Sequence, residues 1–356
     1  GTMAAAVPPK GTDKLAFKLE WVDTAAALKR HYLMQYFLMP SGNQLELFDL
    51  KNHRVFLKKT PYPSVELDDL FIGAKVTIYA RQMTVVDYGD EATRRLLAKA
   101  AAKTFGLVGA GDFKQLGRVI EAANGAGLTL GRLKSVYLTA GDAAAVGARE
   151  GGLTVGMELV GPDAHEKWAA AAAGFGSCVV APSSEAGEAA IASFFGADAP
   201  ASARESSAEV KDCATAVVLP HLVLKKAAGP VVDALINNPV GLRVSAIQLF
   251  DIDMVAAEEF LEVYKGVVPE YRAMAEQLSS GRFLVLELVG DNAVNTLREY
   301  VGPADPEVAG RIRKDTLRAR FGVDRVRNGV HCTDLDEDGE LESEYFFRIL
   351  QDAAFA

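Results

Sequence analysis

Short apolar runs separated by turn residues characterise the first quarter of the chain. The runs cover residues 17–22, 32–39, 45–50, 55–58 and 75–86, and they are rich in aromatic and β-branched residues. Turn signals such as Pro-Ser-Gly-Asn and Thr-Pro-Tyr-Pro lie between them. This pattern predicts a small all-β domain over residues 13–92. The Ala-rich segment 93–102 that follows predicts a helix.

Two copies of one pattern occupy the rest of the chain. Glu158-Leu-Val-Gly161 recurs as Glu287-Leu-Val-Gly290, and a Phe-Phe pair at 194–195 recurs at 346–347. An earlier match joins residues 127–138 to residues 241–250. The shared order of the three matches indicates a duplicated unit. The second copy is longer, by 15 residues before the Glu-Leu-Val-Gly motif and by 23 after it.

Strands and helices alternate in the second copy. Apolar, β-rich runs predict strands at 215–219, 244–250 and 283–289. Helices are predicted at 225–237, 254–264, 269–278 and 292–300, the last with Asn292 as its N-cap. This order predicts an α+β fold, with an antiparallel sheet covered by helices in a ferredoxin-like α/β sandwich. We expect a truncated sandwich domain at 103–200 and a complete one at 213–352.

Composition narrows the class of protein. The 356 residues are 49% hydrophobic and 24% charged, which is typical of an ordered globular chain. No apolar run reaches the ~20 residues that a bilayer-spanning helix needs, and residues 3–10 lack the pattern of a signal peptide. The formal net charge is −9, and nearly all of the acidic excess lies in residues 211–356. An acidic surface repels phosphate backbones, so a nucleic-acid binder is disfavoured.

The number and spacing of the cysteines indicate the redox environment of the protein and predict no cysteine-based site. Cys178, Cys213 and Cys332 are an odd number and lie far apart. This arrangement predicts neither a disulfide framework nor a zinc site, and it favours a reducing, cytoplasmic environment. The acidic segment 334–338 is similar to the start of a calcium loop, but Tyr345 stands where that loop needs its glutamate. We interpret the segment as a solvated loop, with weak divalent binding left open and no metal site predicted.

His331 is the candidate with the strongest case for chemistry, although a lone histidine is more often a surface or core residue. Asn328 and Asp334 flank it at three residues on either side, and Glu342 follows eleven residues later. An imidazole nucleophile needs one free ring nitrogen and a partner that holds the other. Phosphoryl transfer also needs cations, for which Arg298 and Arg318 are suited.

The segment Asn328-Gly-Val-His331-Cys-Thr-Asp334 resembles the active site of nucleoside diphosphate kinases, whose motif is N-x-x-H-G-S-D. The segments Val263–Val268, Gly302–Pro306 and His331–Leu335 resemble more specifically the axonemal nucleoside diphosphate kinase 7 type. That type carries two kinase-like domains behind an N-terminal DM-ten domain, a small pleckstrin-like β fold. Segments of residues 13–92 match the DM-ten pattern, among them Phe17–Asp23, Phe56–Lys59 and Asp87-Tyr-Gly-Asp90.

The resemblance implies a role for each candidate residue. His331 would carry the phosphoryl group, and Glu342 would orient the imidazole of His331. Arg298 and Arg318 would hold phosphates, and Asn328 would contact the nucleotide. Mg²⁺ would enter with the nucleotide if the site is active, and otherwise no cofactor is expected.

Departures from the family pattern argue for weak activity. The family's K-P-D-G reads Leu219-Pro-His-Leu here, its stacked tyrosine corresponds to Leu261, and its phosphate-binding threonine is missing after Gly302. In the first copy, Gly109 occupies the lysine position and Val179 lies near the histidine position. The second copy is therefore expected to be weak or inactive, and the first inactive.

Two functions follow from the resemblance. The first is a structural protein of the ciliary or flagellar axoneme, on the inner wall of doublet microtubules, with tubulin and other axonemal proteins as partners. Lys51, Arg54, Lys58 and Lys59 form a basic cluster that could meet an acidic surface, although such clusters are usually solvated hairpins. The alternative is a working nucleoside diphosphate kinase that transfers the γ-phosphate between nucleotides through phospho-His331.

Overall fold

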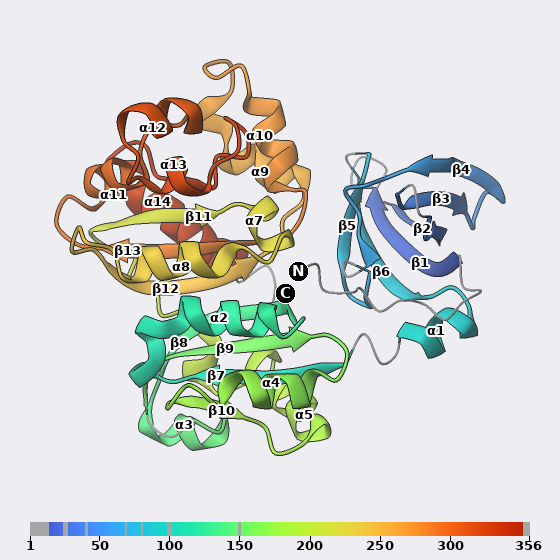
Figure 1. The fold of residues 1–356 in the computed structure, drawn as a ribbon, viewed down its shortest axis with the longest axis horizontal. Coiled ribbons are helices and arrows are strands. Elements are labelled where there is room, and N and C mark those ends of the chain that lie inside the picture. The colour runs from blue at the N-terminus through green and yellow to red at the C-terminus, as the bar shows by residue number, and fades with distance from the viewer. Residues whose placement is uncertain are drawn as a thin grey trace. The chain divides into compact units, whose positions relative to one another are not determined.

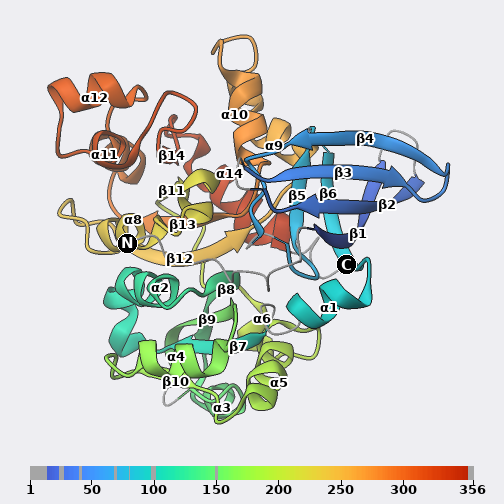
Figure 2. The same cartoon turned by 45° about the vertical axis from the view of Figure 1, so that its right-hand side comes forward.

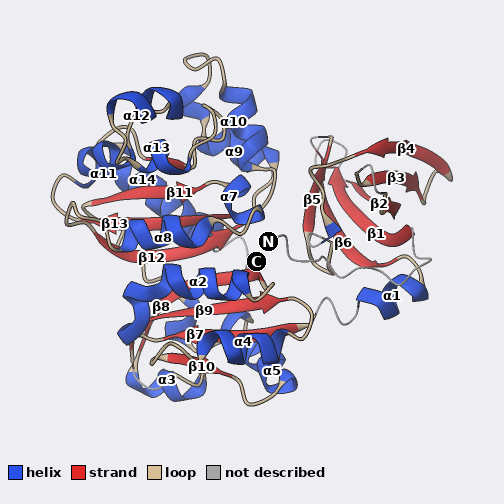
Figure 3. Cartoon of the chain, viewed as in Figure 1, coloured by secondary structure: helices blue, strands red, loops and turns tan. Residues whose placement is uncertain are grey.

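The computed structural model describes residues 14–23, 28–39, 42–67, 70–79, 81–97, 102–148 and 151–351. The chain divides into two compact units, one containing residues 1–102 and the other containing residues 103–278 and 282–356. Each unit has its own antiparallel sheet (Figures 1 and 3). The segment 3–10, which lacks the sequence pattern of a signal peptide, lies outside the described residues.

The first unit is a six-stranded antiparallel half-barrel (Figure 1). Its sheet has the order β4-β3-β2-β1-β6-β5, followed by helix α1 (Glu91–Leu97). The predicted run 75–86 is two strands rather than one, because the chain turns between Ile78 and Arg81. The strands are β1 (Lys14–Asp23), β2 (Leu28–Phe37), β3 (Gln44–Asp49), β4 (Arg54–Pro61), β5 (Lys75–Ile78) and β6 (Arg81–Tyr88).

Alternation of buried and open positions places the core inside the half-barrel. In β3, every second residue is buried, namely Leu45, Leu47 and Asp49. Successive side chains of a strand point to opposite faces, so one face of the sheet is apolar. The fully buried side chains Phe17 and Tyr36 fill the same interior from neighbouring strands.

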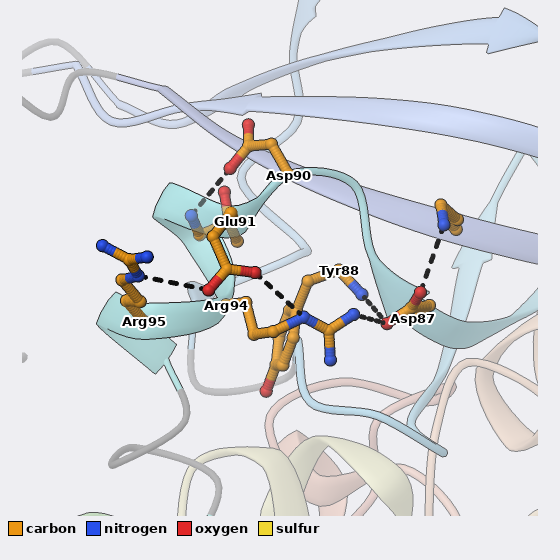
Figure 4. A network of polar contacts seen from close by, with 8 residues as sticks. Asp87, Tyr88, Asp90, Glu91, Arg94 and Arg95 are labelled. Carbon is orange, nitrogen blue, oxygen red and sulfur yellow. Dashed lines mark hydrogen bonds and ion pairs between the residues drawn. The ribbon is translucent and has the colours of Figure 1, made fainter.

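The Asp87-Tyr-Gly-Asp90 motif joins helix α1 to strand β1 (Figure 4). Asp87 accepts hydrogen bonds from Lys18 on β1 and Arg94 on α1. The Lys18 bond is the largest of the effects that hold the pKa of Asp87 below its usual value. Asp90 Oδ1 accepts from the Thr93 amide at 2.7 Å, which caps the first turn of the helix. A Cβ at position 89 would lie 2.7 Å from the Ala16 side chain, so glycine is required there.

The second unit contains one continuous sheet of eight strands in the order β10-β7-β9-β8-β12-β13-β11-β14. The first repeat contributes β7 (Lys103–Val108), β8 (Thr129–Leu138), β9 (Gly152–Val160) and β10 (Cys178–Val180). The second repeat contributes β11 (Cys213–Val218), β12 (Arg243–Phe250), β13 (Phe283–Val289) and β14 (Val330–Cys332).

Both repeats have the same strand order. When the strands of each repeat are numbered one to four along the chain, the order in each half of the sheet is 4-1-3-2. The two halves meet at their second strands, β8 and β12, where Gln248 pairs with Lys134. This is the antiparallel, helix-covered arrangement of a ferredoxin-like sandwich, so the predicted fold class is confirmed.

Helices complete the two halves of the second unit. The first repeat has α2 (Leu116–Gly125) after the short 3₁₀ turn Ala110–Gln115, then α3 (Ala140–Ala145), α4 (Ala164–Ala172), α5 (Ser184–Phe195) and α6 (Ala201–Arg204). The second has α7 (Pro220–Leu224), α8 (Ala228–Ile236), α9 (Met254–Phe260), α10 (Tyr271–Leu278), α11 (Ala293–Val301), α12 (Pro306–Ile312), α13 (Leu317–Phe321) and α14 (Asp338–Glu344).

The extra residues of the second repeat form two recognisable parts. Between β12 and β13 lies a helical hairpin made of α9, the 3₁₀ turn Glu262–Tyr264 and α10, where the first repeat has only α3. Between α11 and β14 lie α12 and α13, where the first repeat passes directly from α4 to β10. We call these parts the hairpin and the loop segment (residues 302–329). The first repeat therefore lacks both walls that flank β14 in the second.

Two local expectations differ from the structure. The predicted helix 225–237 corresponds to α8 and begins three residues later than expected, because Lys226 has a left-handed conformation; the separate short helix α7 ends just before the predicted range. Asn292 precedes α11 but is itself left-handed (φ 52°), and its side chain makes no capping bond to the helix. Its Oδ1 instead accepts a hydrogen bond from Asn295. None of the helices in the described residues is both long and apolar enough to cross a lipid bilayer.

Helices α2 and α8 bring the two repeats into close backbone contact (Figure 1). A Cβ at Gly117 of α2 would lie 2.4 Å from the Asp233 amide nitrogen of α8. A Cβ at Gly229 of α8 would lie 2.7 Å from the Gly117 carbonyl oxygen. The glycines are required here by the distance between the helices.

Substituting Gly117→Ala is therefore expected to destabilise the second unit by about 1–3 kcal/mol, because backbone atoms cannot move aside as a flexible side chain can. Gly125→Ala on the same helix is the matched control, since a Cβ there meets nothing within 4 Å. It should be neutral or stabilising by a few tenths of a kcal/mol. Urea unfolding of both variants measures the difference, and equal stability would contradict the proposed helix contact.

Candidate functional site

The histidine singled out in the sequence lies on the edge strand of the sheet. His331 is the middle residue of β14 and pairs with Val217 of β11. Figure 2 shows β14 with α9 and α10 on one side and α11 and α12 on the other. The pairing of β14 with β11 thus places the strand that carries His331 between the hairpin and the loop segment.

Two aromatic rings of the hairpin cover the imidazole. The ring centroid of Phe260 lies 5.4 Å from that of His331, and the Tyr264 centroid lies 5.9 Å away, both edge-on. His331 is only 7% exposed, and its Nε2 has no hydrogen-bond partner within the part of the chain that the structure describes. Burial lowers the pKa of His331 to about 4, so the imidazole is neutral at physiological pH.

Asp334 connects the hairpin to the strand that carries His331. The Tyr264 hydroxyl donates a hydrogen bond of 2.6 Å to Asp334 Oδ2. The Arg298 guanidinium lies 3.5 Å from the other carboxylate oxygen. Arg298, predicted to hold phosphate, is thus paired with a carboxylate and half exposed. Sequence reasoning missed Tyr264, because it took Leu261 as the aromatic position and Leu261 is buried in the apolar core.

Glu342, predicted to orient the imidazole, bonds instead to Thr333. The Thr333 hydroxyl donates to Glu342 Oε2 at 2.6 Å and accepts from the Thr215 amide at 2.9 Å. Among the described residues, no hydrogen bond joins Glu342 to His331. Burial raises the pKa of Glu342 to about 8, with Asp338 and Asp334 acting in the same direction and the Thr333 bond against it. The orienting role of Glu342 stays a prediction.

Arg318, the second predicted phosphate ligand, is buried and holds the backbone together. Its Nε donates to the Val330 carbonyl and its Nη1 to the Gly302 carbonyl, each at 2.8 Å. Its Nη2 lies 3.9 Å from Cys332 Sγ. The guanidinium therefore ties the start of the loop segment to β14. Its role toward phosphate stays a prediction.

Leu219 lies opposite Gly329 at the end of the β11–β14 pair, and Asn328 is the residue before Gly329. The Leu219 amide donates to the Gly329 carbonyl at 3.1 Å, and Gly329 has the positive φ (+87°) that glycine tolerates. Asn328 is buried, and its Oδ1 has no partner among the described residues. The Leu219 side chain belongs to the apolar core with Val217 and Phe250.

The corresponding place in the first repeat has the same backbone hydrogen bond and one additional bond from a carboxylate. Val179 is the middle residue of β10, as His331 is of β14, and it pairs with Leu107. The Gly109 amide donates to the Ser177 carbonyl at 3.1 Å, and the Asp112 carboxylate accepts from the Ser177 amide. These bonds join the turn after β7 to the start of β10.

No group of three or more histidine, cysteine and carboxylate side chains is arranged to hold a metal ion in the described parts of the chain. In the acidic loop, Asp336 accepts hydrogen bonds from Asn295 at 2.9 and 3.2 Å. The loop carboxylates thus bond to protein groups of α11.

Family models match parts of both units of the chain. A family model described as the nucleoside diphosphate kinase 7 N-terminal PH domain matches residues 10–99, and the nucleoside diphosphate kinase model matches residues 212–351. The Aquifex aeolicus nucleoside diphosphate kinase is 30% identical over 135 residues, which are 38% of this chain and 93% of that protein. A crystal structure of an Aquifex aeolicus nucleoside diphosphate kinase covers 39% of this chain and 97% of its own, with 29% identity and a TM-score of 0.37.

The fold and the site define a nucleoside diphosphate kinase-like protein with an N-terminal pleckstrin-like domain. The mouse nucleoside diphosphate kinase homolog 7 is 36% identical over 386 residues, covering 96% of this chain and 95% of that protein. The rat homolog 7 is 34% identical with the same coverage. The chain belongs to the nucleoside diphosphate kinase homolog 7 family, as the sequence motifs predicted.

The raised pKa of Glu342 predicts a stability that falls with rising pH. The folded protein keeps a proton on Glu342 that the unfolded chain releases above the ordinary pKa of 4.5. The contribution of this proton to the free energy of unfolding is therefore complete below pH 4.5 and is lost as the pH rises to about 8. The free energy of unfolding should therefore fall by on the order of 1 kcal/mol per pH unit between pH 6.5 and 7.5. Glu342→Gln should flatten this slope in urea titrations.

Glu344→Gln is the control for that measurement. Glu344 lies on the same helix, is half exposed and pairs with Arg348. Its substitution should leave the slope unchanged. A slope that survives in Glu342→Gln would show that the proton is held elsewhere.

Proposed function

We propose that this protein is a structural component of ciliary and flagellar doublet microtubules, located on the inner wall of the axoneme within the cytoskeleton. It is built from a DM-ten domain at 13–92 and two nucleoside diphosphate kinase-like domains at 103–200 and 213–352. The second of these keeps a nucleotide site with weak or lost phosphotransfer. Similarity to homolog 7 proteins over nearly the whole chain supports this proposal.

The observation that carries the loss of activity is the apolar setting of Leu219. The resemblance places the family's lysine at this position, beside nucleotide and phosphate. Here the side chain is 6% exposed and packs in the core of the second repeat. Loss of one charge-assisted hydrogen bond costs about 1.5–3 kcal/mol, or ten- to a hundredfold in binding or rate. The first repeat has no histidine on β10, which leaves His331 to carry any remaining transfer.

The β3–β4 hairpin of the first unit supports a microtubule partner. Lys51, Arg54, Lys58 and Lys59 are all exposed on it, and none forms an ion pair with a carboxylate of the described residues. Two exposed apolar side chains, Leu50 and Val55, lie beside them. Lys59 lies over the Phe37 ring at 3.8 Å, and Arg54 is the cross-strand neighbour of Asp49. A surface of exposed cations around apolar side chains is complementary to an acidic protein surface, such as that of tubulin.

Reversing two of these charges should weaken microtubule binding. The double substitution Lys51→Glu with Lys58→Glu is expected to reduce affinity by about tenfold at low salt, because complementary charge acts over about a Debye length. Co-sedimentation with taxol-stabilised microtubules measures the effect. The control is Lys14→Glu with Arg95→Glu, which changes the net charge of the same unit by the same amount at positions outside the hairpin. This variant should bind as the parent does.

The alternative function is an active nucleoside diphosphate kinase that uses a magnesium-bound nucleoside triphosphate as donor. The observation in its favour is a pair of buried polar atoms without partners, His331 Nε2 and Asn328 Oδ1. Such atoms are costly unless a ligand satisfies them. An imidazole with a free Nε2 can accept a phosphoryl group and return it to a nucleoside diphosphate, which gives ping-pong kinetics.

Labelling with γ-³²P-ATP separates the two functions. We expect acid-labile, alkali-stable label to form at least about tenfold more slowly than on the Aquifex aeolicus enzyme, given the missing cationic contact. Any label should vanish in His331→Ala and persist in His165→Ala, a control histidine of the first repeat. Rapid, stoichiometric labelling that depends on His331 would establish the kinase and refute the weak site.

A further inference from the structure

Three loop tips of the second repeat meet at one arginine. Arg325 lies in the tight turn 323–327, which is closed by the Val323 amide bonding to the Arg327 carbonyl. Its Nε donates to Asp305 Oδ2 at 2.8 Å, and its Nη1 lies 3.5 Å from Glu270 Oε1. Asp305 is the N-cap of α12, and Glu270 immediately precedes α10. Arg325 thus joins the loop segment to the hairpin.

This ion pair spans the same two walls that enclose His331. The hairpin supplies Phe260 and Tyr264 against the imidazole, and the loop segment is tied to β14 by Arg318. The Tyr264–Asp334 hydrogen bond beside His331 joins the hairpin to the residues that follow β14, not to the loop segment. The Arg325–Glu270 pair, in contrast, links the hairpin directly to the loop segment, and we expect a ligand that enters between these walls to meet it.

The two arginines predicted from the sequence to hold phosphate are already bonded to protein groups. Arg318 is buried and donates to two backbone carbonyls, and Arg298 is paired with Asp334. Leu219 offers no charge. Arg325, in contrast, is 63% exposed and held by surface ion pairs. Such pairs are worth little, so a stronger anion can replace the carboxylate at small cost.

The two carboxylates that contact Arg325, those of Asp305 and Glu270, differ in how firmly other bonds hold them. Asp305 also accepts the Glu307 and Val308 amides at the start of α12, so it stays in place. Glu270 has the longer contact with the guanidinium, and it belongs to the opposite wall. The pair with Glu270 is therefore the contact that opens.

We propose that Arg325 is a nucleotide-contacting residue of the second repeat, which exchanges the carboxylate of Glu270 for a phosphate oxygen when a nucleoside polyphosphate enters between the hairpin and the loop segment. This proposal rests on the nucleotide site proposed above. A guanidinium suits the exchange, because it binds carboxylate and phosphate with the same planar set of donors. Arg325 thereby supplies a cation that the apolar Leu219 does not.

Opposite effects of two substitutions test the exchange. Isothermal titration of the full chain with magnesium-ADP at low salt should show Arg325→Gln binding about fivefold more weakly and Glu270→Gln binding about twofold more tightly, as expected for contacts near the surface. Glu270→Gln removes the competitor but keeps the cation. If the pair only held the cleft closed, both substitutions would tighten binding, and if it only held the walls in place, both would weaken it. Either result would overturn the proposal.

Three controls complete the design. Arg325→Lys keeps the charge and should recover at least half of the lost binding free energy. Arg311→Gln removes an exposed arginine of α12 that pairs only within its own helix, with Glu307, and should bind as the parent does. Thermal unfolding should be the same for the parent and all variants, since the contacts are exposed. If the parent binds no ADP, the proposed nucleotide site fails together with this inference; if the parent binds and the two variants do not diverge, this inference alone fails.

Discussion

The pairing of β11 with its two neighbours is the constraint on which the candidate site depends. All six residues of β11 are buried, and the strand pairs with β13 along its length and with β14 over three residues. The short partner β14 carries His331, which is placed opposite Val217 by the register. Because side chains alternate between faces, a slip of one residue would turn the imidazole to the opposite face. Thr333 strengthens the register, since its hydroxyl accepts the Thr215 amide.

The site that this pairing builds carries less charge than its residue types suggest. Burial keeps His331 neutral and raises the pKa of Glu342 to about 8. Arg318 is saturated by carbonyl oxygens, and Asp334 is held by Tyr264 and Arg298. These polar side chains satisfy one another's hydrogen bonds and charges, so burying them without a ligand costs little free energy. Among the described residues of this site, His331 Nε2 and Asn328 Oδ1 are buried without a hydrogen-bond partner.

Duplication gave one sequence motif two structural uses. Glu158 in the first repeat is buried against Lys103 and Arg132, which neutralise it. Its counterpart Glu287 is fully buried and accepts the amides of Glu209 and Val210, together with the hydroxyls of Ser245 and Ser343. It thereby holds the connection between the repeats against the sheet. A buried carboxylate needs such partners, and each copy found a different set.

Local periodicity in the sequence determined the strands, repeated motifs in the same order determined the duplication, and the residues around His331 determined its choice. The run Phe283–Val289 was predicted as a buried strand and is β13 with the same bounds, because an unbroken apolar run can be buried on both faces of a sheet. Contacts between distant residues were decided only by the tertiary structure. Tyr264 meets Asp334 across 70 residues, and Arg325 meets Glu270 across 55. Neither pair leaves a periodic signal, since each depends on where two loops end after the sheet has formed. For the same reason, the burial that makes His331 neutral could not be read from its neighbours in the chain.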